Sequence, residues 1–103
     1  MKNNSIKLAN CELIKTVKTL LKREGAKRIS IFGSYARNQN KKNSDIDIMV
    51  TFHREMGYLE FIGIENKLAE RLGRKVDLIT EESVSPYIID NIKKDEIVIY
   101  ESK

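Results

Sequence analysis

The connection between the first two apolar segments most constrains the fold of this chain. Residues 28–32 and 46–52 each predict a strand, because β-branched residues alternate with polar ones in the first and apolar residues dominate the second. About a dozen residues, with no full helix among them, join these two strands. Parallel neighbours need a longer crossover, usually a helix. The spacing therefore argues against a doubly wound parallel sheet and favours a mixed β-sheet flanked by helices.

The rest of the chain predicts three helices and two further strands. Apolar residues recur at helical spacing in three segments, of which glycine ends the first two and Ser85-Pro86 caps the third. The sequence predicts one α/β (α+β) domain over residues 1–103 with the order α-β-β-α-β-α-β. The expected helices cover residues 6–24, 58–72 and 86–94, and the expected strands cover 28–32, 46–52, 75–80 and 96–101, the last at a sheet edge.

Composition fits a soluble domain in the cytoplasm. Of the 103 residues, 41% are apolar and 33% are charged, and no apolar run approaches the ~20 residues needed to cross a bilayer. The N-terminus does not look like a signal peptide. Cys11 is the only cysteine, which excludes an internal disulfide and suits a reducing compartment. The formal net charge of +4 favours an anionic ligand but is too small to indicate nucleic-acid binding.

Three acidic residues lie in or beside apolar strands. Asp45 and Asp47 point to the same face of their strand, with Cα atoms roughly 6–7 Å apart. Asp77 lies between Val76 and Leu78 in another strand, and would join the pair if the two strands are neighbours. Isolated acids in such places are costly unless a cation pairs with them. Oxygen ligands without a histidine or cysteine cluster indicate Mg²⁺ or Mn²⁺, although Asp-x-Asp alone is a common accident.

A glycine-serine turn follows the first strand. Gly33 permits a positive φ and a close approach of backbone to a ligand, and successive N–H groups at a turn can cradle an anion. Ser34 adds a hydroxyl donor. The spacing is not that of a Walker loop, because no Gly-Lys-Ser/Thr follows. The turn therefore indicates a phosphate site beside the acids, with an ordinary turn as the alternative.

The combined pattern resembles a known family. Gly33-Ser34-Tyr35-Ala36-Arg37, followed by Ser44-Asp45-Ile46-Asp47, is similar to the signature of the polymerase-β-type nucleotidyltransferases. The short chain and Asp77 resemble the minimal nucleotidyltransferases (MNT), which are often antitoxin partners of HEPN-domain toxins. One departure is Asn38, where many relatives carry glycine.

The resemblance implies roles for particular residues. Gly33 and Ser34 would hold the triphosphate, and Asp45 and Asp47 would bind two Mg²⁺. Asp77 would be the third metal-binding carboxylate and could accept a proton. The implied reaction transfers a nucleoside monophosphate, expected to be AMP from ATP, to an acceptor hydroxyl.

The role of Arg37 and the roles of the aromatic residues stay open. Arg37 suits phosphate or acceptor binding, and a structural salt bridge explains it equally well. Tyr35 could stack on a base or lie in solvent near the turn. Three other aromatic side chains are expected to pack against the sheet, those of Tyr58, Phe61 and Tyr87.

The acceptor also has alternatives. The small size leaves no second domain to grip an RNA or antibiotic, so we expect the acceptor to be a hydroxyl on a partner protein such as a HEPN toxin. One rival is a non-catalytic antitoxin that blocks the toxin by contact. Another is a subunit that modifies a small molecule or RNA within a larger complex. An RNA-binding domain ranks lower, because no strand interleaves aromatic and basic residues. The final strand and first helix could also serve oligomerisation.

Overall fold

The computed structural model describes residues 10–37, 39, 41 and 44–102. The order α-β-β-α-β-α-β is confirmed, and a short 3-10 turn, η2, follows the third strand. Residues 6–9 of the expected first helix, and Asn38, lie outside the described residues. The elements are α1 (Cys11–Arg23), β1 (Ala26–Phe32), β2 (Ile46–Phe52), α2 (Tyr58–Leu72), β3 (Val76–Thr80), η2 (Glu81–Ser83), α3 (Pro86–Asp95) and β4 (Ile97–Glu101).

The four strands form a mixed sheet in the order β3-β2-β1-β4. β1 pairs antiparallel with both β2 and β4, whereas β2 and β3 are parallel. This is the expected outcome of the two connections, because the segment after β1 returns without a full helix and α2 provides the crossover that parallel strands need. β4 lies at an edge of the sheet, as predicted, and β3 forms the other edge.

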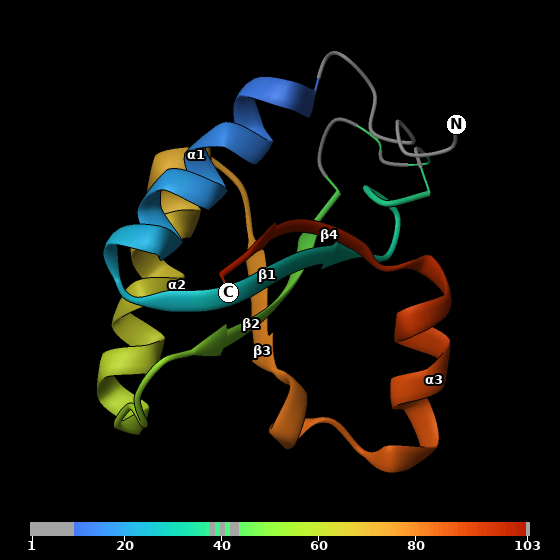
Figure 1. Cartoon of the computed structure of the whole chain (residues 1–103). Coiled ribbons are helices and arrows are strands. Elements are labelled where there is room, and N and C mark those ends of the chain that lie inside the picture. Colours follow the sequence, from blue (N-terminus) through green and yellow to red (C-terminus); the bar gives the residue numbers. More distant parts are fainter. Residues whose placement is uncertain (1–9, 38, 40, 42–43, 103) are drawn as a thin grey trace.

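Helices α1 and α2 cover one face of the sheet, and α3 lies on the other side (Figure 1). Each strand turns one row of apolar side chains toward α1 and α2, which makes a continuous core. None of the described helices is both long and apolar enough to cross a membrane. The buried core residues of the helices and strands are Val17, Leu20, Leu21, Ala26, Ile29, Ile31, Ile46, Ile48, Val50, Ile64, Leu68, Val76 and Leu78.

Local signals set the ends of two helices. Gly73 follows α2 in the left-handed conformation, with φ +68°, and its N–H donates to the carbonyl of Ala69. A residue without a Cβ adopts this conformation at least cost. Ser85 caps α3, because its side chain accepts a hydrogen bond from the N–H of Tyr87, and Pro86 takes the first helical position. The predicted start of α3 is therefore confirmed.

Two of the three aromatic expectations are wrong. Phe61 does pack toward the sheet, where it contacts Phe52 edge to face with ring centroids 6.4 Å apart. Tyr58 and Tyr87 instead have exposed fractions of 77% and 91%. Each lies in the first turn of its helix, α2 or α3, and its side chain faces solvent. Helical periodicity could not have shown this, because it identifies the apolar face of a helix but not whether another element covers the first turn.

Candidate active site

The register of β2 and β3 brings Asp47 and Asp77 together. The two residues are directly paired in the parallel ladder, on the face of the sheet opposite α1 and α2. Alternation along β2 sends Ile46 and Ile48 into the core and Asp47 to the other face. The strand of Asp77 is therefore a neighbour of the strand of Asp47, as the prediction of a third carboxylate at the site requires.

Asp45 lies just before β2 and its side chain is exposed. Its charge reaches Asp47, because it contributes to the raised pKa of that residue. Among residues 10–37, 39, 41 and 44–102, however, no three side chains of His, Cys, Asp and Glu lie close enough together to form a metal-ligand set as they stand. The structure therefore brings Asp47 and Asp77 into contact and leaves Asp45 nearby.

Asp47 lies in an environment that disfavours its charge. Burial, followed by the charges of Asp77 and Asp45 and a hydrogen bond to Asp77, raises the pKa of Asp47 to about 6. Arg37 acts in the opposite direction, and its effect is smaller than those of burial and the two acids. A carboxyl group whose pKa is raised in this way has too little positive charge around it. A cation bound among these acids would supply that charge.

The turn after β1 approaches the same carboxylate. Gly33 has φ +75°, and a Cβ built on it would overlap Oδ2 of Asp47. Only glycine satisfies both conditions without strain. The Arg37 N–H donates to the Gly33 carbonyl at 3.1 Å, which closes one helical turn. Within the described part of the chain, the N–H groups of residues 34–36 have no hydrogen-bond acceptor, so the turn presents three amide donors that could bind an anion.

Arg37 forms the salt bridge that was one of its two expected roles. Its Nη1 lies 2.8 Å from Oδ2 of Asp95, at the end of α3, and its Nε donates to Gln39. The side chain is still 43% exposed, and its charge acts on Asp47. The salt bridge thus holds Arg37 between α3 and the acids without using all of its five N–H donors.

Tyr35 is neither a stacking platform nor exposed. Its side chain is completely buried, and its hydroxyl lies 3.5 Å from the carbonyl oxygen of Ser44. Arg74 donates a hydrogen bond to the same hydroxyl from the segment that leads into β3. Both sequence expectations for Tyr35 are therefore wrong. The sequence offered no signal for its contact with Arg74, because the two residues lie 39 positions apart.

Glu96, directly before β4, forms hydrogen bonds with two side chains of β1. It accepts hydrogen bonds from Arg28 at 2.8 Å and from Ser30 at 2.6 Å, and its side chain is only 7% exposed. Burial opposes the charged form, but these donors, first Arg28 and then Ser30, hold the pKa of Glu96 below its ordinary value. No sequence motif indicates this role of Glu96, because its partners Arg28 and Ser30 lie 68 and 66 positions away.

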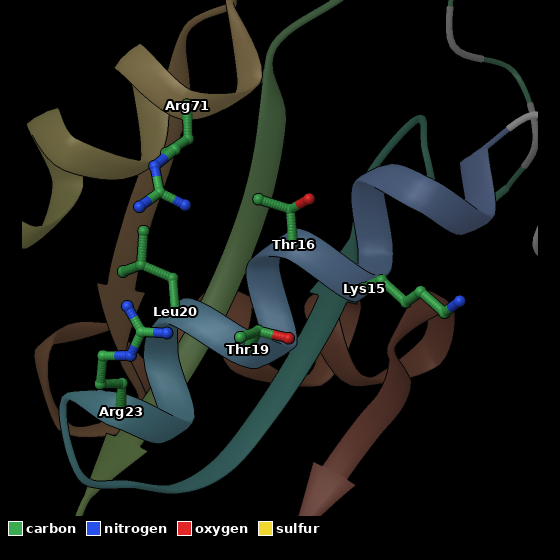
Figure 2. A pocket seen from close by; sticks show the side chains of 6 residues that line it. All are labelled: Lys15, Thr16, Thr19, Leu20, Arg23 and Arg71. Atoms are coloured by element: carbon green, nitrogen blue, oxygen red, sulfur yellow. The ribbon is translucent and has the colours of Figure 1, made fainter.

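Two hollows lie away from the acids. One of about 760 Å³ lies where β2 and β3 end, beside the first turns of α2, and includes Phe52, Phe61 and Thr80. The other, of about 180 Å³, lies between α1 and α2 on the helical face (Figure 2). Neither hollow is lined by Asp45, Asp47 or Asp77. The acids and the glycine turn instead form an open site on the sheet.

The chain's donor set suits a magnesium ion. Mg²⁺ binds one or two carboxylates and keeps several waters. Asp47 and Asp77 are adjacent carboxylates whose mutual repulsion is only partly offset by Arg37, and the charge of the exposed Asp45 also acts on Asp47. The chemistry of the site therefore fits the metal that the sequence predicts.

Comparisons with known proteins show the family of this chain. The model of the family described as polymerase beta, nucleotidyltransferase matches residues 15–103. The chain belongs to this family, and it is a nucleotidyltransferase.

Individual relatives cover most of the chain. A protein of Methanocaldococcus jannaschii named "Putative protein adenylyltransferase MJ1217" is 43% identical over 90 residues, which are 85% of this chain and 92% of that protein. Protein adenylyltransferase MntA of Thermococcus cleftensis is 35% identical over 82 residues, which are 80% of this chain and 83% of that protein. A crystal structure of a toxin-antitoxin with AMP-PNP contains a chain that is 25% identical, with a TM-score of 0.78 over 87% of this chain and 74% of that one.

Proposed function

We propose that this chain transfers AMP from ATP to a hydroxyl group of a partner protein, and that it is the antitoxin of a HEPN-domain toxin. The observation that carries the proposal is the pairing of Asp47 with Asp77 beside the turn at Gly33. The similarity to proteins named protein adenylyltransferase supports a protein acceptor. The similarity to a toxin-antitoxin structure with AMP-PNP supports the nucleotide and the kind of partner.

The turn after β1 would bind the triphosphate. Its amides in residues 34–36, which have no acceptor within the described residues, and the hydroxyl of Ser34 would be the donors to the phosphate groups. Arg37 would add a fork of N–H groups for phosphate, held in place by Asp95. These groups would place the α-phosphate next to Asp47, because Gly33 lies directly against that carboxylate.

Asp45, Asp47 and Asp77 would hold Mg²⁺, or Mn²⁺, with two ions as the expected number. Bound there, the metal would lower the pKa of the acceptor hydroxyl and offset charge on the leaving phosphates. The protein itself supplies placement and a fixed field, which is most of what phosphoryl transfer requires.

The transfer exchanges one P–O bond for another. The acceptor oxygen forms a bond to the α-phosphorus while the bond from that phosphorus to the bridging oxygen breaks, and pyrophosphate leaves. The hydroxyl proton needs an acceptor, and we assign it to Asp77, which is exposed on β3. Asp77 is then both a metal ligand and the base.

The test uses the chain together with its genomic neighbour. The co-purified pair is incubated with [α-³²P]ATP and Mg²⁺, and label on the neighbour is located by mass spectrometry. We expect labelled AMP on a hydroxyl side chain, and no label from the double variant Asp45→Asn, Asp47→Asn. Absence of label on the neighbour, in a preparation whose wild-type chain is folded and binds ATP, would reject a protein acceptor.

Inhibition by contact is the second candidate. It is favoured by the exposed apolar side chains in the first turns of α2 and α3, which include Tyr58, Leu59, Tyr87 and Ile88. Growth rescue in cells that express the toxin separates the two functions. If the double variant still neutralises the toxin, contact alone is sufficient and transfer is not the antitoxin activity.

A further inference from the structure

Tyr35 lies where three segments of the proposed active site meet. It follows Gly33 by two residues in the phosphate-binding turn. Its hydroxyl lies 3.5 Å from the carbonyl oxygen of Ser44, the residue directly before Asp45. Arg74, three residues before Asp77, donates to that hydroxyl. One buried phenol therefore links the turn with the segments that lead into both acidic strands.

The Tyr35 hydroxyl forms two hydrogen bonds, one as acceptor and one as donor. The Tyr35 hydroxyl accepts from Arg74 and has its own proton to donate to the Ser44 carbonyl, so both of its hydrogen-bonding roles are used. The guanidinium carbon of Arg74 also lies 6.0 Å from the centre of the Tyr35 ring, which adds a cation–π contact.

Arg74 is itself fixed from two sides. Its N–H donates to Ala69 at the end of α2, beside the left-handed Gly73. Its Nε is buried and has no acceptor within the described residues, where the hydroxyl of Tyr35 is the hydrogen-bond acceptor of the guanidinium. The next residue, Lys75, accepts a hydrogen bond from Ile46 at 3.1 Å, which begins the pairing of β2 with β3.

We infer that Tyr35 and Arg74 are positioning residues that hold Asp45 and Asp77 in place relative to the phosphate-binding turn. This rests on the proposed function only for its consequence in catalysis. The Tyr35 hydroxyl contacts the backbone carbonyl of Ser44 and the guanidinium of Arg74, and the Arg74 N–H donates to the carbonyl of Ala69. The pair therefore acts by fixing backbone.

The first test measures the free protein and needs no activity. In Tyr35→Phe, which keeps the ring and removes the hydroxyl, amide hydrogen exchange at Ile46 should accelerate by about tenfold, the ratio that one lost hydrogen bond of ordinary strength produces. Tyr100→Phe is the matched control, because Tyr100 also lies under a cation, Lys22 at 4.9 Å, but is on β4. Its exchange at Ile46 should stay at the wild-type rate.

The second test measures transfer. Tyr35→Phe should lower kcat by about tenfold and leave the KM for ATP within about twofold, because ground-state binding by the turn persists. Arg74→Lys, which keeps a donor, should recover part of the kcat lost in Arg74→Met. If either Tyr35 or Arg74 variant fails to fold, the other carries both measurements.

The outcomes separate this inference from the proposed function. Unchanged exchange at Ile46 in Tyr35→Phe would overturn the inference, whatever the activity. Faster exchange with wild-type kcat would overturn it as well, since the contact would then be structural only. Faster exchange in a chain whose wild type transfers nothing would uphold the positioning of the acids and reject the proposed reaction.

The hollow between α1 and α2 carries a second, independent inference. Its lining contains three basic residues, two threonines and Leu20, with no acid. Figure 2 shows Arg23 on α1 and Arg71 on α2 extending toward Leu20 from either side. Neither arginine has an ion pair within the described residues, although Lys67 on the same helix as Arg71 pairs with Glu24. The lining residues are Lys15, Thr16, Thr19, Leu20, Arg23 and Arg71.

We propose that this hollow binds the phosphate groups of an oligoanion. Two guanidinium groups line this hollow with no acid on its lining, so their positive charge is not offset there, and their planar forks match phosphate. The hydroxyl of Thr19 lies on the same lining as a further donor. The hollow is on the helical face, whereas Asp47 and Asp77 lie on the other face, so its ligand is not the reacting nucleotide.

Binding is tested with two probes, inorganic tripolyphosphate and a 12-nucleotide single-stranded RNA, by calorimetry on the whole chain. The double variant Arg23→Gln, Arg71→Gln should weaken binding by at least about tenfold, as two lost charge-assisted contacts imply. Lys27→Gln with Lys94→Gln is the control of equal charge and should reduce affinity by less than about threefold. Preference for one probe identifies free oligophosphate or an RNA backbone as the source. Equal losses in both double variants, or no binding of either probe, would overturn the proposal.

Discussion

At the scale of single residues, Gly33 shows how closely backbone and acid approach each other. Gly33→Ala would place a Cβ against the Asp47 carboxylate at φ +75°. We expect a loss of about 1–3 kcal/mol in the free energy of unfolding, the usual cost of a left-handed non-glycine residue. Nucleotidyl transfer should fall as well, because Asp47 must move.

The control for Gly33 is Gly63, an exposed residue inside α2 with nothing near a built Cβ. Gly63→Ala should stabilise the chain by about 0.5–1 kcal/mol. Urea unfolding of both variants checks the pair. Equal effects of the two substitutions would mean that the contact with Asp47 is not a constraint.

Asp47 should give the metal-free protein a pH-dependent stability. Burial and the charges of Asp77 and Asp45 raise its pKa to about 6, whereas an unfolded aspartate titrates near ~3.9. The folded chain therefore holds this proton more tightly. Its contribution to stability is fully present below pH ~4 and is lost as the pH rises through ~6.

Asp47→Asn should remove the loss of stability that the wild type shows as the pH rises through ~6. Because Asp47 is only partly buried, solvent screening reduces the expected gain at pH ~7 to about 1 kcal/mol. Urea unfolding in the presence of a chelator, at several pH values between about 4 and 8, measures the difference. Parallel pH curves for the wild type and the variant would contradict the assignment.

At the scale of elements, Glu96 is the main side-chain link between β4 and β1. Glu96→Gln removes the charge that Arg28 and Ser30 pair with inside a nearly buried network, which should cost about 1.5–3 kcal/mol. Glu101→Gln is the matched control, because Glu101 lies 3.6 Å from Arg28 with a side chain that is 62% exposed. It should change stability by less than about 0.5 kcal/mol. Thermal unfolding that ranks the two variants equally would refute this difference.

The elements themselves could be predicted because their local signals agree. Alternating residues identified β1, and Ser85-Pro86 identified the start of α3. The adjacency of β2 and β3 cannot be predicted with certainty, because pairing between strands separated by a helix is not encoded by either strand alone. The environment of Tyr35 escapes prediction for the same reason, since its contact with Arg74 joins segments 39 positions apart.

At the scale of the whole molecule, the acids lower the stability of the metal-free fold and a cation should restore it. On the proposed mechanism, Mg²⁺ raises the thermal midpoint, because a ligand that binds only the folded state stabilises it by mass action. At a concentration of about 100 times Kd the gain is ~2.7 kcal/mol. Differential scanning fluorimetry with MgCl₂, against NaCl of equal ionic strength, measures the shift. A midpoint that rises equally in the double variant Asp45→Asn, Asp47→Asn would place the ion elsewhere.

The parallel pairing of Asp47 with Asp77 makes the proposed chemistry depend on how many residues separate the strands. A single residue inserted between Gly73 and Val76 could leave α2 and the sheet intact while sending position 77 toward the helices. Among natural relatives, the length of that short connection should therefore vary far less than the lengths of the loops around it. A homologue with an odd insertion there should have lost transfer and kept its shape.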